Sequence, residues 1–446
     1  MNTLRAGYSC VDITASLGTY MDGYYKDRFA EGVWDPLLLR CMAFACGEDK
    51  VILIAMDACE ISTANCDELR KQVSEKTGLP VDAIFAHTTH THTAAELMGK
   101  DVAGAKEYAR FVQGRAADAA VMALEDLKPA KMGYAIGQAP NIAFVRRFRM
   151  KDGSVQTNPG VDNPDIVHPI GDVDERVNVL RFDREGADTL VLMNFGNHPD
   201  VVGGSRQSAD WPGLSCVALE RAIPGVKAIF FNGAQGDVNH VNVHPRGGDL
   251  NDLENDFDDV TRGYGHALHM ANVVAGGVLQ VYSKVKYVDV DKIRFVQRLV
   301  KIPSNMPTAE EAVEAHRIND LHEAGKDHEL PYSGMMLTTV VAKAARMVRL
   351  EHGPETFDLT LAGIALGDVA MVGIPGEPFT GIGRGLKETE GWGLVLPVCL
   401  TNGCEGYFPM QEAYDEGGYE AGSSIFKAGV AELLIREGQE MLGGLK

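Results

Sequence analysis

The sequence predicts an α/β protein in which mixed β-sheets are flanked by helices. Apolar runs of strand length, such as Val51–Met56 and Val226–Phe231, alternate with helical segments without a strict period. Thr63–Thr77 has helical spacing and a polar face. His198 and Glu377 each follow an apolar run, and ligands of open α/β sheets gather at such strand ends. We therefore expect the functional site at the carboxyl ends of strands.

The remaining elements follow from the same patterns, taken in chain order. Residues 4–25 are expected to be irregular, 246–259 to form a hydrophilic loop, and 402–424 to be loop-like. Further strands are expected at Leu37–Ala45, Asp82–Phe85, Val177–Phe182, Thr189–Phe195, Leu359–Leu366, Val369–Ile374 and Leu394–Leu400. Further helices are expected at Tyr108–Leu127 and Gly263–Leu279. We expect residues 1–446 to form a single domain, with a mostly helical insertion around 305–350.

Composition excludes several kinds of partner. The net charge of −20 argues against nucleic acid or an anionic membrane surface. No apolar run is long enough to cross a bilayer, and the N-terminus shows no secretory signal. The eight cysteines form no C-x-x-C pair and are expected to be reduced thiols. The sequence therefore predicts a cytoplasmic protein that acts on a small-molecule substrate, with no membrane insertion.

A histidine-rich segment follows one predicted strand. The segment Ala86–Leu97 reads AHTTHTHTAAEL. In an extended backbone His90 and His92 would point to the same face, and His87 to the other. The H-x-H pair at a strand end favours a metal or catalytic role over a structural one. For His87 alone we expect a structural role.

Two further residues could complete a metal site. His198 precedes a proline, and Glu377 lies between prolines in the rigid turn I-P-G-E-P-F. Two histidines and a carboxylate are a common catalytic zinc set that leaves one position open for water. Taken singly, His198 could instead cap a strand end, and Glu377 could be a solvated turn residue.

Arginines and tyrosines offer hydrogen-bond donors for a substrate. Arg146 and Arg147 could clamp a carboxylate or oxyanion, or they could face solvent. Tyr407, Tyr414 and Tyr419 could donate to a developing oxyanion, or they could be core aromatics.

The spacing of these motifs resembles the catalytic domain of the neutral/alkaline (non-lysosomal) ceramidase family. The similarity runs from Asp12-Ile13-Thr14 to about Phe426. Five segments resemble family motifs: Thr89-His90-Thr91-His92-Thr93, Asn197-His198-Pro199, Gly236-Asp237-Val238-Asn239, Pro375-Gly376-Glu377-Pro378-Phe379, and Tyr407 with Tyr419-Glu420-Ala421-Gly422-Ser423-Ser424. The THTH segment and the tyrosine spacing are the specific ones.

The resemblance implies a zinc-activated water that attacks an N-acyl bond. By resemblance, the ligands of Zn²⁺ would be His90, His198, Glu377 and Tyr407. His92 would polarise or protonate the scissile amide. Tyr419 would help to hold the oxyanion, and Arg146 would correspond to an arginine of the family site.

Three departures from the family pattern bear on the substrate. Asn239 replaces the family serine of G-D-V-S, and an amide can donate a hydrogen bond but cannot act as a nucleophile. The family's secretory leader and C-terminal immunoglobulin-like domain are expected to be missing. A hydrophilic insertion, HPRGGDLNDLENDFDDV, lies where a sphingolipid site would need apolar surface. We therefore expect a smaller soluble amide, lactam or ester in place of ceramide.

The leading hypothesis is a zinc-dependent hydrolase that cleaves an amide-type C–N bond. Asn239, Tyr419 and Arg146 would stabilise charge beside the catalytic His92. Arg147, Tyr414 and Asp237 are the predicted substrate-binding residues. The alternatives are a metal-dependent hydrolase of esters, lactones or phosphoesters, and a non-catalytic binding protein that contains a metal.

Overall fold

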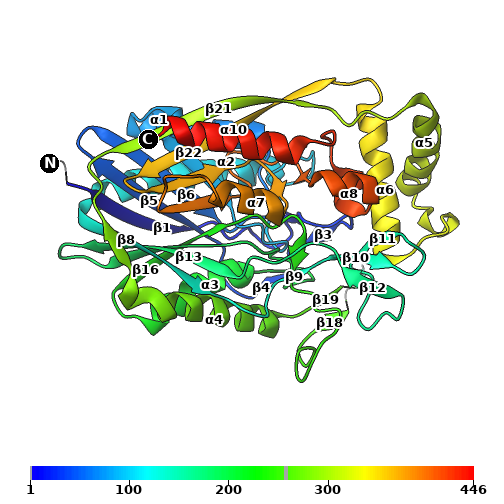
Figure 1. The fold of residues 1–446 in the computed structure, drawn as a ribbon, viewed down its shortest axis with the longest axis horizontal. Coiled ribbons are helices and arrows are strands. Elements are labelled where there is room, and N and C mark those ends of the chain that lie inside the picture. The colour runs from blue at the N-terminus through cyan, green and yellow to red at the C-terminus, as the bar shows by residue number, and fades with distance from the viewer. Residues whose placement is uncertain (1–2, 256–259) are drawn as a thin grey trace.

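Two β-sheets stacked face to face form the centre of the protein, and helices cover both outer faces (Figure 1). The computed structural model describes residues 3–255 and 260–446. The larger sheet has the order β16 (Val226–Asn232), β14 (Thr189–Phe195), β13 (Arg176–Arg184), β8 (Lys128–Gln138), β1 (Arg5–Asp12), β5 (Leu38–Cys46), β6 (Asp49–Met56) and β7 (Ile84–Thr88), with β20 (Lys286–Val288) beside β8. The smaller sheet has the order β21 (Ile293–Pro303), β22 (Thr356–Leu366), β23 (Val369–Gly373) and β25 (Leu394–Val398).

Both sheets are mixed, which confirms the predicted fold class. The pairs β14–β16, β6–β7 and β23–β25 are parallel, whereas β1–β5 and β21–β22 are antiparallel. Short strands complete the description: β2 (Tyr20–Met21), β3 (Arg28–Phe29), β4 (Gly32–Val33), β9 (Phe144–Val145), β10 (Arg147–Met150), β11 (Val155–Thr157), β12 (Ile166–Pro169), β15 (Arg206–Gln207), β17 (Val238–Asn239), β18 (Glu254–Asn255), β19 (Thr261–Arg262), β24 (Glu377–Pro378) and β26 (Tyr407–Phe408).

The central strands are apolar because both of their faces are buried. In β6, Leu53 points toward the smaller sheet, and Ile54 points toward the helices on the other side. In β22, Ile364 packs between the sheets and Leu361 packs under the helices of the opposite face. Successive side chains of a strand alternate between faces, so a strand between two apolar layers loses its polar alternation.

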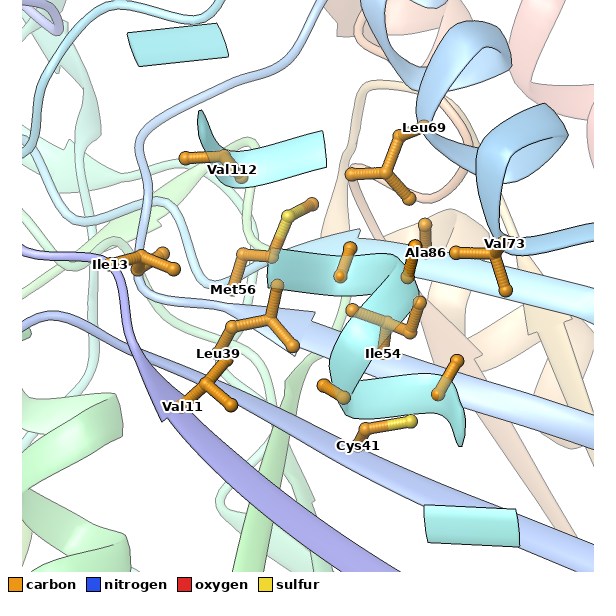
Figure 2. Close-up of a cluster of buried hydrophobic side chains, with 14 of the residues drawn as sticks. Val11, Ile13, Leu39, Cys41, Ile54, Met56, Leu69, Val73, Ala86 and Val112 are labelled. Carbon is orange, nitrogen blue, oxygen red and sulfur yellow. The ribbon is translucent and has the colours of Figure 1, made fainter. Parts of the chain in front are cut away.

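Three pairs of helices form the outer layers. The α1 (Thr63–Thr77) and α2 (Ala105–Glu125) pair covers one half of the larger sheet, where Leu69 and Val112 belong to the same buried cluster as Ile54 (Figure 2). The α3 (Asp210–Ala222) and α4 (Tyr264–Val281) pair covers the other half. The α7 (Thr380–Lys387) and α10 (Val430–Gly444) pair covers the smaller sheet.

The predicted helical segment forms α5 (Ala309–Glu323) and α6 (Gly334–Leu350). These helices lie at the end of the molecule opposite the C-terminus (Figure 1). A capping box between Thr308 and Glu311 begins α5. Arg346 Nε of α6 donates to the Gly422 carbonyl at 3.2 Å and so ties the segment to α9 (Tyr419–Ser423).

Several predicted elements differ from the structure. Residues 4–25 contain β1, so the expectation of an irregular segment there is wrong. Gly7 of β1 lets α2 approach closely, since a Cβ at this position would lie 2.0 Å from the Ala123 carbonyl oxygen. Because β1 contains small residues at this close contact, its sequence RAGYSCVD has no apolar run that would predict a strand. Residues 402–424 contain β26, α8 (Gln411–Glu416) and α9 in addition to loops. Of the predicted loop 246–259, residues 256–259 lie outside the described part of the chain.

All eight cysteines are free thiols, as the sequence predicts. Within the described ranges, no helix combines the length and the apolar character needed to cross a bilayer.

Replacing Ile54 by alanine should lower the free energy of unfolding by about 2–5 kcal/mol, because the side chain is fully buried between β6 and the α1–α2 layer. Urea denaturation gives this value directly. Val313→Ala is the matched control, since Val313 is 74% exposed and its truncation should change stability little. Equal losses in the two variants would contradict the layer assignment.

Candidate metal centre

Three side chains from distant parts of the chain meet at one buried point. His90 Nε2 lies 3.3 Å from Glu377 Oε2, and His198 Nε2 lies 3.2 Å from the same oxygen. All three residues are buried, and together they form a group that could hold a metal ion. The sequence prediction that His90, His198 and Glu377 lie together is therefore met by the geometry.

Each of these residues follows the carboxyl end of a strand. His90 comes after β7, and His198 comes after β14, both of the larger sheet. Glu377 follows β23 of the smaller sheet and begins β24. The three side chains therefore meet at the junction between the two sheets.

The histidine segment turns where an extended strand was expected. The segment Val81–Ala83 is a short 3₁₀ helix, and β7 ends at Thr88. His90 has a left-handed φ of 76° and its N–H donates to the Ala58 carbonyl at 2.8 Å. This turn, and not strand alternation, brings His92 Nε2 to 3.2 Å from His90 Nε2. The predicted proximity of the pair is right, but its predicted cause is wrong.

His87 has the structural role expected for it. Its Nδ1 donates to the Cys399 carbonyl at 2.8 Å, and its Nε2 accepts from the Asn232 N–H at 3.0 Å. Asn232 Nδ2 in turn donates to the carbonyls of Thr89 and Asn197, which flank His90 and His198. One buried amide thus connects the two loops that carry the histidines.

Hydrogen bonds leave the Nε2 atoms of both histidines as acceptors. His90 Nδ1 donates to the Cys59 carbonyl at 3.0 Å, and His198 Nδ1 donates to the Gln235 carbonyl at 3.1 Å. A neutral imidazole that donates at Nδ1 carries a lone pair at Nε2. Arg146 Nη1 lies 3.3 Å from His198 Nε2, and a guanidinium can only donate. That contact independently requires the lone pair on His198.

Glu377 adds a carboxylate oxygen to the two imidazole nitrogens. Its buried Oε2 has no hydrogen-bond partner among the described residues. Two Nε2 atoms and one carboxylate oxygen therefore converge, an arrangement that costs free energy unless a proton or a metal ion lies between them. Imidazole and carboxylate donors suit Zn²⁺, and backbone carbonyls that orient the rings are typical of metal-bound histidines. These residues fit a zinc ion.

A second group, Cys59, His90 and His92, is less suited to a metal. Burial raises the pKa of the Cys59 thiol well above its usual value, whereas a metal needs the thiolate. The His90 Nδ1 atom that faces the thiol is already used by the Cys59 carbonyl. The group of His90, His198 and Glu377 is therefore the better candidate.

Tyr407 lies beside this group through strand pairing. The two-residue strands β24 and β26 pair in parallel, with Glu377 opposite Tyr407. The Tyr407 ring stacks on His198 with a centroid distance of 6.5 Å. The Tyr419 ring, at a centroid distance of 5.6 Å, and the Arg146 guanidinium, 5.3 Å from the ring centre, also lie beside Tyr407.

The charges in the centre are strongly coupled. Burial lowers the pKa of His90, but the Glu377 carboxylate outweighs burial and raises that pKa to about 9. Burial, followed by the Arg146 charge, lowers the pKa of His198. Burial opposes ionisation of Glu377, yet the two histidines hold its pKa well below the usual value. Burial also lowers the pKa of His92 well below its usual value, so this imidazole is neutral.

A cavity of about 500 Å³ opens beside the acceptor group. A small-molecule site commonly has about 300–1,000 Å³. Of the residues singled out in the sequence, five line it: His90, His92, Glu377, Tyr407 and Tyr419. Tyr419 contacts Tyr25 across the cavity wall, with 3.3 Å between their hydroxyl oxygens.

Arg146 and Arg147 are engaged by the protein and do not line this cavity. Arg146 Nε donates to Glu420 Oε1 at 2.7 Å, and its Nη2 donates to the Gly236 carbonyl at 2.8 Å. Arg147 Nη2 donates to Glu416 Oε2 at 3.2 Å.

Asn239, Asp237 and Tyr414 also lie outside the cavity lining. Asn239 Nδ2 donates to Asn158 Oδ1 at 2.9 Å. Asp237 Oδ1 accepts from the Thr380 N–H at 2.7 Å, which fixes the start of α7. The Tyr414 hydroxyl donates to the Phe426 carbonyl at 2.8 Å.

The cavity is also lined by residues that sequence reasoning did not single out. These are chiefly Tyr20, Asp22, Tyr25, Glu60 and Lys100. Glu60 follows β6, so the rule that active residues follow apolar strands could have indicated it. The residues between Tyr20 and Tyr25 have no comparable signal, because only tertiary folding brings them to the cavity.

Comparison with known proteins identifies the fold. No protein-family model matches the chain, and no curated protein is significantly similar to it. The crystal structure of neutral ceramidase from Pseudomonas aeruginosa matches the whole chain and 75% of that protein, with a TM-score of 0.72 and 15% identity. A structure described as ceramidase complexed with C2 matches the whole chain and 76% of that protein, with a TM-score of 0.71 and 15% identity. The ceramidase resemblance is thus confirmed at the level of the fold.

Loss of one acceptor should abolish tight zinc binding. Purified protein is expected to bind about one zinc ion per chain, and Glu377→Gln or His198→Ala should bind far less, because each variant removes a ligand that would hold the ion. Metal analysis after dialysis measures this. Zinc should also raise the Tm of the apo wild type and not that of Glu377→Gln. His168→Ala, at an exposed histidine, is the control and should keep its zinc. Full occupancy in Glu377→Gln would contradict the site.

Zinc affinity should rise with pH up to about 9. In the absence of metal, the Glu377 carboxylate raises the pKa of His90 to about 9, so zinc must displace a proton at neutral pH. Displacement of a single proton changes the apparent affinity roughly tenfold per pH unit. Competition with a chromophoric chelator at several pH values measures the slope, and calorimetry in two buffers counts the protons released. Affinity that stays constant from about pH 7 to pH 9 would contradict this assignment.

Proposed function

We propose that this protein is a zinc-dependent hydrolase that cleaves an amide C–N bond in a small soluble substrate. His90, His198, Glu377 and Tyr407 would hold the ion. The observation that carries the proposal is the convergence of two imidazole nitrogens on Glu377 Oε2 beside a cavity of ligand size. The fold shared with neutral ceramidase structures supports an amide-hydrolysing activity.

A zinc ion at this site would polarise a carbonyl group and lower the pKa of a bound water to about 7. The protein would manage the protons. His92 is neutral, and its Nε2 faces His90 Nε2 at 3.2 Å, so it can accept a proton there and return it to the leaving nitrogen. The acyl carbon takes the oxygen of the water and the leaving nitrogen takes a proton, so the products are a carboxylic acid and an amine. The Tyr419 hydroxyl lines the cavity and stays protonated, because burial raises its pKa, so it can donate to the developing oxyanion.

Arg146 would act as a positioning residue. Its guanidinium is fixed by Glu420 and Gly236, and it directs one N–H toward His198 Nε2 and its face toward Tyr407. A cation at this place keeps His198 unprotonated, and its contacts order the side chains of His198, from the loop after β14, and of Tyr407, from β26.

The two alternatives receive less support. Asn239 motivates ester or phosphoester hydrolysis, but its amide bonds to Asn158 and does not line the cavity. A non-catalytic protein with a structural metal would close the metal site, whereas here a cavity opens beside it. As part of the proposal we keep a cytoplasmic location, since eight free thiols are typical of a reducing compartment.

His92→Gln should retain zinc and lower kcat on N-acyl substrates by roughly 10²–10⁴-fold, the usual contribution of a general acid–base residue. The measurement is amine release from a panel of N-acyl amides by zinc-loaded protein, together with metal analysis of each variant. His328→Gln, at an exposed histidine, is the matched control. A panel in which esters turn over and no amide does would overturn the amide assignment. Undiminished activity in His92→Gln would remove His92 from the mechanism.

A further inference from the structure

The wall of the cavity beside the candidate metal centre combines tyrosine rings with charged groups and imidazoles. Among the described residues, none of those that line it is leucine, isoleucine, valine, phenylalanine or methionine. Tyrosines form much of the wall, and Asp22, Glu60 and Lys100 add charges. A pocket for an aliphatic chain needs apolar side chains, whereas this wall suits a polar ligand.

One carboxylate in the wall has no counter-ion. Asp22 Oδ1 pairs with Lys100 Nζ at 2.9 Å, so these two charges offset each other. Glu377 faces the two histidines of the acceptor group. Glu60 forms no ion pair with any residue of the described ranges. Burial raises the pKa of Glu60 to about 7, so a cation bound beside it would stabilise the ionised carboxylate.

Glu60 has a defined place relative to the reacting centre. The carbonyl of the preceding residue, Cys59, accepts the hydrogen bond from His90 Nδ1 at 3.0 Å. The loop after β6 thus orients the candidate metal ligand His90 and also presents the Glu60 carboxylate to the cavity beside it. Glu60 is half-buried, and partial exclusion from water strengthens its attraction for a cation.

The aromatic wall adds a second feature that favours a cation. Lys100 Nζ already lies 5.2 Å from the centre of the Tyr20 ring, and Arg28 lies 4.0 Å from that of Tyr24. Tyr25 and Tyr419 present further rings to the cavity. Aromatic faces stabilise ammonium groups within about 6 Å of the ring centre.

We propose that the substrate of this hydrolase carries a positively charged amino group, which binds the Glu60 carboxylate while the amide bond lies at His90 and Glu377. This inference rests on the proposed function and names its substrate class: amides of short diamines or of amino acids with a free amino group. The alternative is that Glu60 binds a second metal ion in place of an amino group. Glu60 belongs to neither of the residue groups that could hold a metal within the described ranges.

Matched amides test the inference. The first substrate is the monoacetyl amide of a straight-chain four-carbon diamine, and its isostere carries a methyl group in place of the ammonium. A second pair places the ammonium or methyl on the acyl side. For at least one pair, zinc-loaded wild type should show roughly 10- to 100-fold higher kcat/KM for the cationic member, as expected for a charge-assisted hydrogen bond. Glu60→Gln should lose that preference and keep its rate on the neutral isostere.

Glu405→Gln is the matched control. It removes one negative charge near the cavity, but Glu405 bonds to Thr63 Oγ1 at 2.6 Å and does not line the cavity. The control should keep the cation preference. Equal rates for both members of each pair, a preference retained in Glu60→Gln, or one lost equally in Glu405→Gln would overturn the inference. A second zinc equivalent that disappears in Glu60→Gln would also overturn it.

Binding measurements separate this inference from the proposed hydrolysis. Calorimetry with the zinc-loaded protein compares the free diamine with the corresponding monoamine, in wild type and in Glu60→Gln. If no amide is cleaved at all, the hydrolase proposal fails. Selective binding of the diamine by wild type alone would then still support the cation site, and equal binding of both amines would overturn it.

Discussion

Two imidazole nitrogens and one carboxylate oxygen meet inside this protein, and much of the structure serves to hold them there. Two backbone carbonyls fix the rings of His90 and His198 so that their lone pairs point at Glu377. Without a proton or a metal ion between them this arrangement is unfavourable, because the nitrogen and oxygen lone pairs have lost their water and repel one another. A divalent ion reverses the sign of each of these interactions. The donor set therefore argues for a metal more strongly than the presence of histidines does.

The two-sheet architecture explains how such distant residues meet. The larger sheet contributes both histidines from the ends of β7 and β14, and the smaller sheet contributes Glu377 from the end of β23. The in-register pairing of β24 with β26 then places Tyr407 beside Glu377. An ion held by these residues would join the sheets at an edge that the apolar core between them does not reach. The stability of that edge would consequently depend on the metal.

Sequence patterns predicted the parts of the fold that depend on local chemistry. Thr63–Thr77 forms a helix with the predicted bounds, since Ser62 caps its start and Gly78 ends it with a φ of 74°. The apolar strands were found because they are buried on both faces. The strands β1 and β8 were not found, since Gly7 and Gly137 sit under helices and leave no apolar run. Pairing between distant strands has no local signature, so neither the stacking of the sheets nor the segment from Tyr20 to Tyr25 could be placed beforehand.

Within the site, motif spacing pointed to the group of His90, His198 and Glu377. It did not separate residues that line the cavity from residues that bond only to the surrounding protein. Arg147, Asp237 and Asn239 lie near the motif residues in sequence, yet their side chains bond to the surrounding protein. Glu60 shows the converse, since it was not singled out from the sequence and yet lines the cavity. The main-chain carbonyl of Cys59 orients His90, whereas the side chain of Glu60 lines the cavity. The hydrogen bond from His90 to the Cys59 carbonyl does not use the side chain at position 60. That side chain could therefore change during evolution, and admit new substrates, while the orientation of His90 stayed the same.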